Sequence, residues 1–289
     1  MAQRKTIRSR RLGKQIRRIR LDAQFNQEKL AEWMNADQPS QRGISASHLS
    51  RVESGIARIN TEHLDRILEV LDVGTEQALK LDTLRRHADE RGWWQEYSDI
   101  VDEAMEMLAE IGEDAISARS YDNVFVQGLL QTRAYAEVAI GNGRAFVAPI
   151  NVDRMAELRL RRQQRLGEDG FHGLVAVLTE GVIRTMVGGR DIMREQLRHL
   201  IEVTQEHPVT IHILPFSAGA LPGVDNFVIF EFPDDLDGDV VYVDSDTAQR
   251  IYEDRHPVRQ CMYTFDAALA QALPARESQD LIRTVMEEL

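Results

Sequence analysis

The chain has 289 residues, of which 43% are hydrophobic, and a formal net charge of −12 at pH 7. This composition is typical of a packed globular protein and argues against a disordered chain, and the length suits two domains. No apolar run approaches the ~20 residues needed to cross a bilayer, and the basic N-terminus lacks the apolar core of a secretion signal. We therefore expect a cytoplasmic protein that does not enter the membrane.

The residues that support metal or catalytic chemistry are few and scattered. The single cysteine, Cys261, excludes an internal disulfide and a zinc site built from several thiolates. His172, His199, His207 and His212 lack the spacing of metal ligands, and no Ser-His-Asp set, phosphate-binding loop or dinucleotide fingerprint is present. We expect no enzyme activity, no catalytic residue, no metal and no cofactor.

Charge is distributed unevenly along the chain. Residues 1–60 contain 13 Lys and Arg against 5 Asp and Glu, a net charge of +8, whereas the remainder contains 22 basic and 42 acidic residues, a net charge of −20. A basic segment on an acidic body suits a protein that binds a polyanion through one part only. The alternative is a solvated basic segment without a partner.

The first 74 residues show the periodicity of a small helical domain. In "LGKQIRRIRLD", Leu12, Ile16 and Ile19 recur at helical spacing among basic residues. Asn26 is a candidate N-cap for a second helix, "QEKLAEWMN", and another amphipathic helix follows in "TEHLDRILEVLD". We expect a basic N-terminal arm formed by Arg4, Lys5, Arg8, Arg10 and Arg11.

The stretch "SASHLSRVESG", residues 45–55, predicts a short helix with clear limits. Ser45 is a good N-cap, and Gly55 supplies the left-handed residue that commonly ends a helix. At 100° per residue, Leu49 and Val52 point inward. The opposite face contains Ser47, Ser50 and Arg51.

Glu53 of the same helix falls near its inward edge. An unpaired carboxylate there would be costly to remove from water. It therefore needs a cation, and Arg20, at the end of the first helix, is the expected partner.

The segments "NQEKLAEWM" and "ISASHLSRVESG", with the helix that follows, resemble the Cro and phage-repressor (XRE) helix-turn-helix domain over about residues 10–73. In such domains the third helix enters the major groove, and the start of the second helix meets the DNA backbone. The resemblance places three residues toward base edges: Ala46, Ser47 and Arg51. It places three at phosphate contacts: Gln27, Ser45 and Arg58. With His48 and Ser50, these residues form the candidate DNA-binding set.

Two features depart from the family pattern. Ala46 replaces a longer polar side chain, so only a thymine methyl contact remains at that position. The insert "ADQPSQRG", residues 36–43, lengthens the turn before the third helix. It therefore affects the angle at which this helix docks on DNA. Proteins of this type usually bind as dimers to half-sites about 34 Å apart or a multiple of it. We therefore expect a homodimer on a roughly palindromic double-stranded DNA operator.

Beyond residue 74, a helical pattern gives way to strands. Residues 75–97 form a charged helical run that we interpret as a connector, and residues 98–168 are mostly helical by periodicity. Short β-rich runs follow in "GLVAVL", "VTIHILPF", "NFVIFEF" and "DVVYV", with a helix between the first two. The sequence therefore predicts an α+β protein: an all-α domain (1–74), a helical connector (75–97) and a mixed α/β domain with a small sheet (98–289).

The second part of the chain is similar to the C-terminal domain of actinobacterial regulators of the WhiJ type. The matching segments are "ERGWWQEY" (90–97), "GLLQTRAYAEV" (128–138), "ELRLRRQQRL" (157–166), "VGGRDIMREQLRHLIE" (187–202) and "VTIHILPFSAGALPG" (209–223). The resemblance implies a transcription regulator, often encoded near a small partner protein of the BldB type. We expect a dimer whose C-terminal domain receives a signal from such a protein or from a ligand. The alternative is an antitoxin-like protein that sequesters a small neighbouring-gene partner and autoregulates its operon.

Four residues of the second part are candidates for contact with a partner or ligand. Trp93 and Trp94 are adjacent, so on a helix they point in different directions, and packing is the alternative role for both. Arg159 and Arg162 belong to a basic helical segment that could bind an anionic ligand or an acidic partner. The alternative for these arginines is ion pairing with carboxylates of the same domain.

Overall fold

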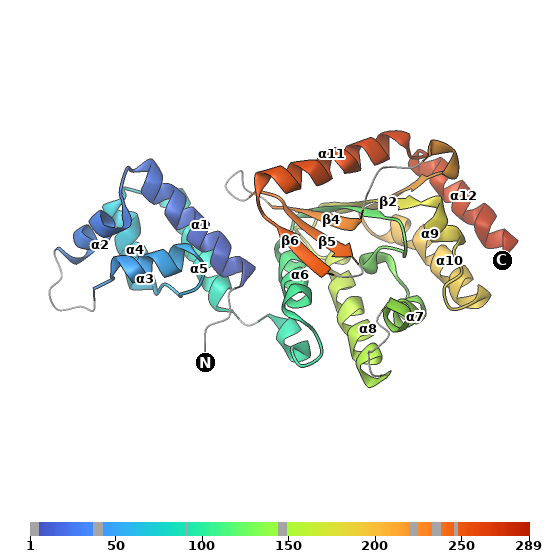
Figure 1. Ribbon diagram of the computed structural model, residues 1–289, viewed down its shortest axis with the longest axis horizontal. Coiled ribbons are helices and arrows are strands. Elements are labelled where there is room, and N and C mark those ends of the chain that lie inside the picture. The colour runs from blue at the N-terminus through green and yellow to red at the C-terminus, as the bar shows by residue number, and fades with distance from the viewer. Residues whose placement is uncertain are drawn as a thin grey trace. The chain divides into compact units, whose positions relative to one another are not determined.

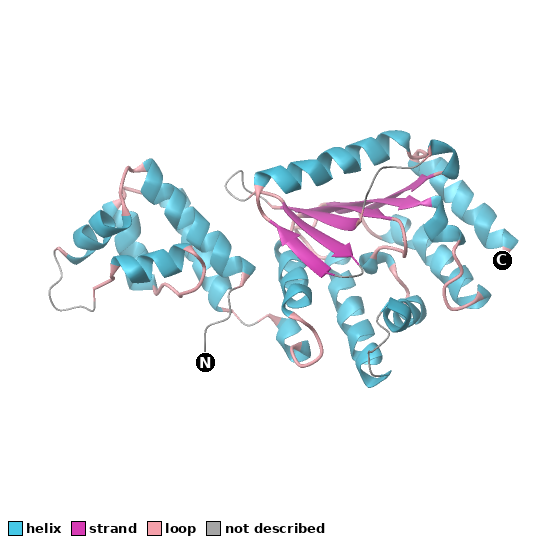
Figure 2. Ribbon diagram, viewed as in Figure 1, coloured by secondary structure: helices cyan, strands magenta, loops and turns pink. Residues whose placement is uncertain are grey.

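The computed structural model describes residues 6–36, 43–90, 92–143, 149–219, 225–232, 238–245 and 248–289. The chain forms two compact units, Met1–Trp93 and Trp94–Leu289, named here the head and the body. The predicted α+β class is confirmed: the head is helical, and the body contains a six-stranded mixed sheet (Figure 1, Figure 2). Within the described ranges, no helix is both long enough and apolar enough to cross a membrane.

The head is built from short amphipathic helices around one apolar core. They are α1 (Ile7–Asp22), α2 (Gln27–Asn35), α3 (Ala46–Glu53), α4 (Thr61–Val70) and α5 (Thr75–Asp89). The first four begin at polar residues whose side chains accept a backbone N–H, which are Thr6, Asn26, Ser45 and Asn60. Ile16, Leu30, Leu49 and Leu64 are fully buried where the helices meet.

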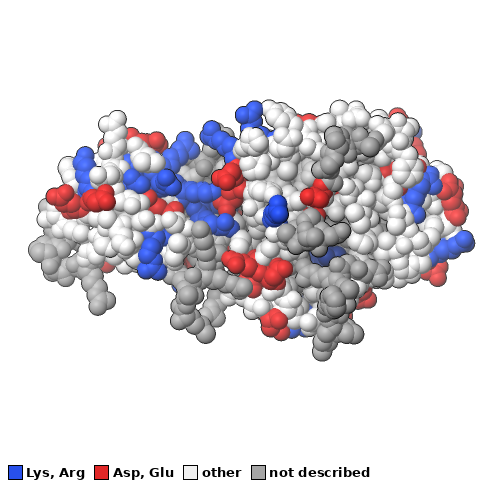
Figure 3. All heavy atoms as spheres, viewed as in Figure 1, with Lys and Arg blue, Asp and Glu red and all other residues white. Residues whose placement is uncertain are grey.

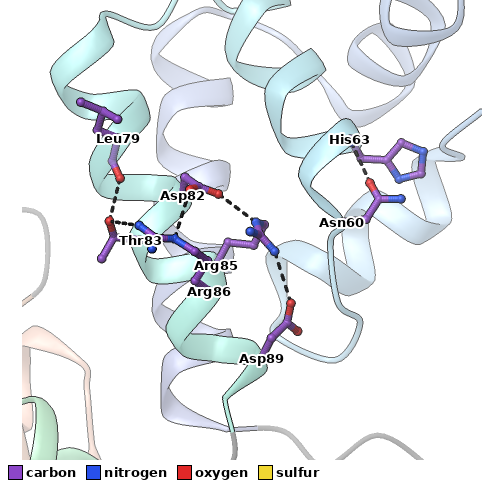
Figure 4. Close-up of polar contacts among 8 residues, drawn as sticks. All are labelled: Asn60, His63, Leu79, Asp82, Thr83, Arg85, Arg86 and Asp89. Carbon is purple, nitrogen blue, oxygen red and sulfur yellow. Dashed lines mark hydrogen bonds and ion pairs between the residues drawn. The ribbon is translucent and has the colours of Figure 1, made fainter.

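Helix α5 differs from the connector expected over residues 75–97, because it packs into the head. Its Leu81 is buried in the head core, and the helix lies against α1 and α4. Its other side is solvated and bears ion pairs (Figure 4). Arg85 and Arg86 both contact Asp82, and Arg85 also reaches Asp89. This charged side dominates the composition of the segment and conceals the narrow apolar side in the sequence.

The basic N-terminal arm is shorter than expected, because α1 starts at residue 7. The hydroxyl of Thr6 accepts a hydrogen bond from a backbone N–H of the first turn and fixes this start. Arg8, Arg10 and Arg11 therefore belong to α1, and Arg8 and Arg11 are buried. Other residues of interest lie outside the described ranges: Arg4, Lys5 and residues 37–42 of the insert.

Two glycines let α1 approach the end of α3 closely. A Cβ atom added at Gly13 would lie 2.4 Å from the carbonyl oxygen of Val52, which is backbone and has little freedom to move. Gly55 has a φ of 69°, and a Cβ there would lie 2.8 Å from the Cα of Arg10. Backbone contact on both sides of its C-terminus therefore fixes α3 against α1.

Gly13→Ala should accordingly destabilise the head by about 1–3 kcal/mol, because the added methyl group overlaps backbone atoms. The matched control is Gly141→Ala in the body, where an added Cβ meets nothing within 4 Å. That change should be neutral or stabilise by up to about 1 kcal/mol. Native-state hydrogen exchange of the α1 amides measures the effect. Unchanged protection in Gly13→Ala would show that the contact is looser than described.

The body is organised around a sheet with strand order β3-β2-β1-β4-β5-β6. The strands are β1 (Ser117–Asp122), β2 (Gly173–Thr179), β3 (Val209–Leu214), β4 (Asn226–Glu231), β5 (Val240–Ser245) and β6 (Ala248–Tyr252). β1, β2 and β3 are parallel, whereas β4 to β6 continue the sheet as antiparallel neighbours. Along the chain, β2 and β3 extend the sheet on one side of β1, and β4, β5 and β6 then extend it on the other side. The strand order reverses at β1.

Residues 98–168 are mostly helical, as expected, but they also contain strand β1, which was not predicted from the sequence. Its sequence, "SARSYD", contains few apolar residues, although it occupies the centre of the sheet. Small or polar side chains, including Ser120 and Asp122, are buried there, so neither helical nor strand periodicity of apolar residues is visible. β6, "AQRIY", was not predicted either, because this strand at the edge of the sheet also contains few apolar residues.

Helices cover both faces of the sheet. They are α6 (Glu103–Asp114), α7 (Arg133–Gly143), α8 (Pro149–Gln163), α9 (Glu180–Arg184), α10 (Arg190–Glu206), α11 (Arg255–Gln271) and α12 (Ala275–Glu288), with the 3-10 turns η1 (Trp93–Tyr97), η2 (Gly128–Leu130), η3 (Gln164–Gly167) and η4 (Phe216–Ala218). α11 lies over one face, where its Phe265 belongs to an apolar cluster with Tyr121, Ile229 and Val241. α6, α7 and α8 lie on the opposite side (Figure 1).

Candidate functional site

Helix α3 presents most of the candidate DNA-binding residues to solvent. The hydroxyl of Ser45 accepts a hydrogen bond from the backbone N–H of His48 at 3.1 Å and starts the helix. The exposed side chains are Ser45, Ser47 and Arg51, and those partly exposed are Ala46, His48 and Ser50. α3 also packs directly on α2. The helix therefore has an outward face of small groups with one arginine and one partly exposed histidine.

A buried ion pair fixes the C-terminal end of α3. Arg20 donates from Nε and Nη2 to the two carboxylate oxygens of Glu53 at 2.5 and 2.8 Å, and from Nη1 to the carbonyl oxygen of Phe25 at 2.7 Å. The hydrogen bond to Glu53 raises the pKa of Arg20 above its usual value. Gln27 donates to Glu53 at 2.7 Å. The expected pair is thus present, and the amide of Gln27 is directed to it.

Arg58, the third candidate phosphate contact, is accessible. Its side chain is 60% exposed and its Nε lies 3.3 Å from a carboxylate oxygen of Asp89. Such solvent-exposed pairs are weak, so a phosphate can replace the carboxylate. Figure 3 shows further Lys and Arg side chains over the head. Exposed basic residues of α1 are Lys14, Arg17 and Arg18.

The body contains a cavity of about 380 Å³ at the carboxyl end of β1. Asp122, the last residue of β1, lines it together with Arg159 and Arg162 of α8. Tyr242 and Asp244 of β5 form another wall. In α/β sheets, ligands bind outside the carboxyl ends of strands at the point where the strand order reverses. The cavity occupies that position in this sheet.

Two charged groups of the cavity, Asp122 and Arg162, each have a buried polar atom without a hydrogen-bond partner among the described residues. Asp122 is 8% exposed, and its Oδ2 accepts no hydrogen bond from the described part of the chain. Burial raises the pKa of Asp122 to about 8. Burial and the neighbouring Arg159 lower the pKa of Arg162 to about 10, and the buried Nε of Arg162 has no hydrogen-bond partner among the described residues. Buried polar groups without partners are uncommon and call for an explanation.

Glutamine side chains hold the segment after β1 in place. Gln131 donates to the carbonyl oxygen of Val126 at 2.6 Å and accepts from Nη1 of Arg159 at 2.5 Å. Gln196 is fully buried and donates to the carbonyl oxygen of Leu130 at 2.7 Å. These bonds fix one wall of the cavity and the position of Arg159, so the site is preformed.

The arginines of α8 lie on two sides of the helix. Arg154 and Arg161, seven residues apart, each pair with a carboxylate preceding α6, at 2.5 and 2.9 Å. Arg159 and Arg162, three residues apart, share a different side of the helix and line the cavity. Ion pairing with these carboxylates therefore occupies Arg154 and Arg161.

The two tryptophan candidates lie away from the arginine candidates. Trp94 is buried and Trp93 half-buried, and neither lines the cavity that contains Arg159 and Arg162. Sequence reasoning missed Asp122, because the strand that ends there was not recognised. An acidic residue at the end of a short strand is the signal that could have identified it. Among the described residues, no cluster of His, Cys, Asp or Glu is suited to a metal.

Comparison with known proteins identifies the body. The model of a domain of unknown function, DUF5753, matches residues 105–284. The matched range includes β1 and α8, which supply Asp122, Arg159 and Arg162 of the cavity. Searches of curated proteins and of solved structures gave no match. Since the match covers more than half of the sequence, the chain belongs to the DUF5753 family.

Proposed function

We propose that this protein is a sequence-specific DNA-binding transcription regulator of the XRE type, acting as a homodimer through α3 of the head. The main support is α3 itself. Its limits are fixed by Ser45 and Gly55, and its outward face exposes Ser47 and Arg51. The buried pair between Arg20 and Glu53 anchors its far end. A short, rigid helix with small outward side chains can enter the major groove closely.

The charge distribution also supports this proposal. Residues 1–60 have a net charge of +8, whereas the rest of the chain has −20. Phosphate contacts release counterions, so DNA binding should weaken steeply with salt. The acidic body repels DNA and confines contact to the head.

Two arginine variants should distinguish contacts that select the DNA sequence from contacts with the DNA phosphates. Arg51→Ala should reduce the preference for the operator over unrelated duplex by about 1–3 kcal/mol, because Arg51 lies on the outward face of α3. Arg58→Ala should weaken binding to all sequences alike and reduce the salt slope by about 1. Arg198→Ala, on the exposed surface of α10, is the control and should change neither. Gel-shift titrations at several salt concentrations measure both quantities. The reverse pattern would show that α3 docks in another orientation.

We assign the body the task of receiving a signal that alters the availability or spacing of two heads. The cavity beside Asp122 favours a small molecule as that signal. A small protein of the BldB type is the other candidate. Thermal stabilisation by a ligand with loss of operator binding supports the first. Co-purification of a small protein that arrests growth when expressed alone supports the second and the antitoxin-like alternative.

A further inference from the structure

We propose that the cavity at the carboxyl end of β1 binds a small organic anion, whose carboxylate or phosphate group contacts Arg159 and Arg162 and whose apolar part lies deeper in the body. The inference deepens the signal-receiving task proposed above and names the chemistry of the signal. It requires only the body, so binding can be measured without DNA.

The first argument is the pair of arginines. Arg159 and Arg162 line the same cavity from neighbouring positions of α8. Gln131 holds one nitrogen of Arg159, while Nε of Arg162 is buried and has no partner within the described ranges. Two adjacent guanidinium groups repel each other, and an anion between them removes this repulsion. Guanidinium groups also match the planar geometry of carboxylate and phosphate oxygens.

The second argument is that Arg162 stays poorly compensated: its pKa remains lowered, although the charge of the nearby Asp244 raises it. Asp122 is buried, and its raised pKa leaves it largely protonated at pH 7. A protonated carboxyl group donates a hydrogen bond, which suits an anionic oxygen of a ligand. Asp102 and Asp244 also line the cavity, but both are exposed, and Asp102 caps α6 by accepting the backbone N–H of Met105 at 2.9 Å. At Arg162, burial therefore outweighs the effect of the neighbouring carboxylate, and an anionic ligand would offset it.

The third argument is the size and lining of the cavity. A volume of about 380 Å³ lies in the range of small-molecule sites, which is roughly 300–1,000 Å³. Apolar side chains of three helices contribute to the wall: Met105, Leu108, Ile140 and Met155. The amides of Gln127, Asn226 and Gln249 add hydrogen-bonding groups. This combination fits an amphipathic anion better than inorganic phosphate alone.

Isothermal titration of the full chain at pH 7 tests the inference with hexanoate and hexyl phosphate. The neutral hexanamide and the cationic hexylamine have the same apolar part and serve as matched probes. Each probe is used at about 10 mM, enough to detect a millimolar dissociation constant. We expect saturable binding of at least one anion, with both control probes at least about tenfold weaker. Tighter binding of hexanoate identifies a carboxylate ligand, and tighter binding of hexyl phosphate identifies a phosphate ligand.

Variants of the cavity assign the binding to its arginines. Arg162→Gln and Arg159→Gln should each weaken binding of the anion at least about tenfold. Arg162→Lys keeps the charge and should bind with intermediate affinity, so a folding defect is distinguished from a lost contact. Arg198→Gln, on the exposed side of α10, should bind like the wild type.

Three results would overturn the inference: no binding of either anion, equal binding of hexanamide or hexylamine, or binding that is unchanged in both glutamine variants. None of these results bears on the head, since no DNA is present in the titration. Conversely, a chain that binds hexanoate but no operator would refute the proposed regulator and leave the ligand site standing.

Discussion

Glu53→Ala should destabilise the head by about 3–5 kcal/mol, because it leaves a buried charge without its counterion. Arg20 is only 5% exposed, and two of its hydrogen bonds end on Glu53. Removal of the carboxylate also leaves the amide of Gln27 without its acceptor. Since α3 is anchored at this end, the variant should also lose DNA binding. Urea unfolding followed by hydrogen exchange of the head amides measures the loss.

The controls separate a lost ion pair from a lost side chain. The double variant Arg20→Met with Glu53→Leu should recover most of the stability, because an apolar pair can replace a buried ion pair without penalty. Glu69→Ala removes an exposed partner of Arg66 and should change stability by about 1 kcal/mol or less. If Glu53→Ala were as stable as Glu69→Ala, the pair would not anchor α3.

Asp122→Asn should stabilise the body at neutral and alkaline pH, by on the order of 5 kcal/mol above pH 8. The pKa of Asp122 is about 8 in the folded state against an ordinary value of 3.8. Between these values the folded state retains a proton that the unfolded state loses, so the free energy of unfolding falls as pH rises. Each unit of pKa difference is worth about 1.4 kcal/mol. Asparagine resembles the protonated carboxyl group and does not titrate.

Unfolding of the body at several pH values between 4 and 9 checks this prediction. The wild type should lose stability across that interval relative to Asp122→Asn, and the two should converge near pH 4. Asp169→Asn, at an exposed position before β2, is the matched control and should follow the wild type. Parallel curves for the wild type and Asp122→Asn would show that Asp122 is ionised and compensated in the folded state. A stabilising substitution at this position is typical of binding sites, where function limits stability.

Local signals account for what the sequence predicted well. The limits of α3 follow from Ser45 and Gly55, whose effects act within one helical turn. The pairing of Arg20 with Glu53 followed from the cost of burying a carboxylate, which holds in any fold that buries this side of α3. The assignment of α+β class rested on apolar strands such as β3, whose composition alone indicates burial.

Non-local packing explains what the sequence did not predict. β1 is a strand because β2 and β4 pair with it on both sides, while its own residues favour no element strongly. The cavity at its end brings Asp122 together with Arg159 and Arg162, which follow about 40 positions later in the chain. Helix α5 packs into the head, although Leu81 is its single buried residue. No periodicity reveals such contacts.

Selection of bound duplexes from a random DNA library by the full chain tests the central proposal most directly. We expect enrichment of an inverted repeat whose half-sites lie about 34 Å apart or a multiple of it, as two copies of α3 require. The same selection with Arg51→Ala should enrich a less defined repeat. The contrary outcome is that the wild type binds the library without enriching any particular sequence, at a salt concentration where binding still occurs. That result would contradict a sequence-reading role for α3.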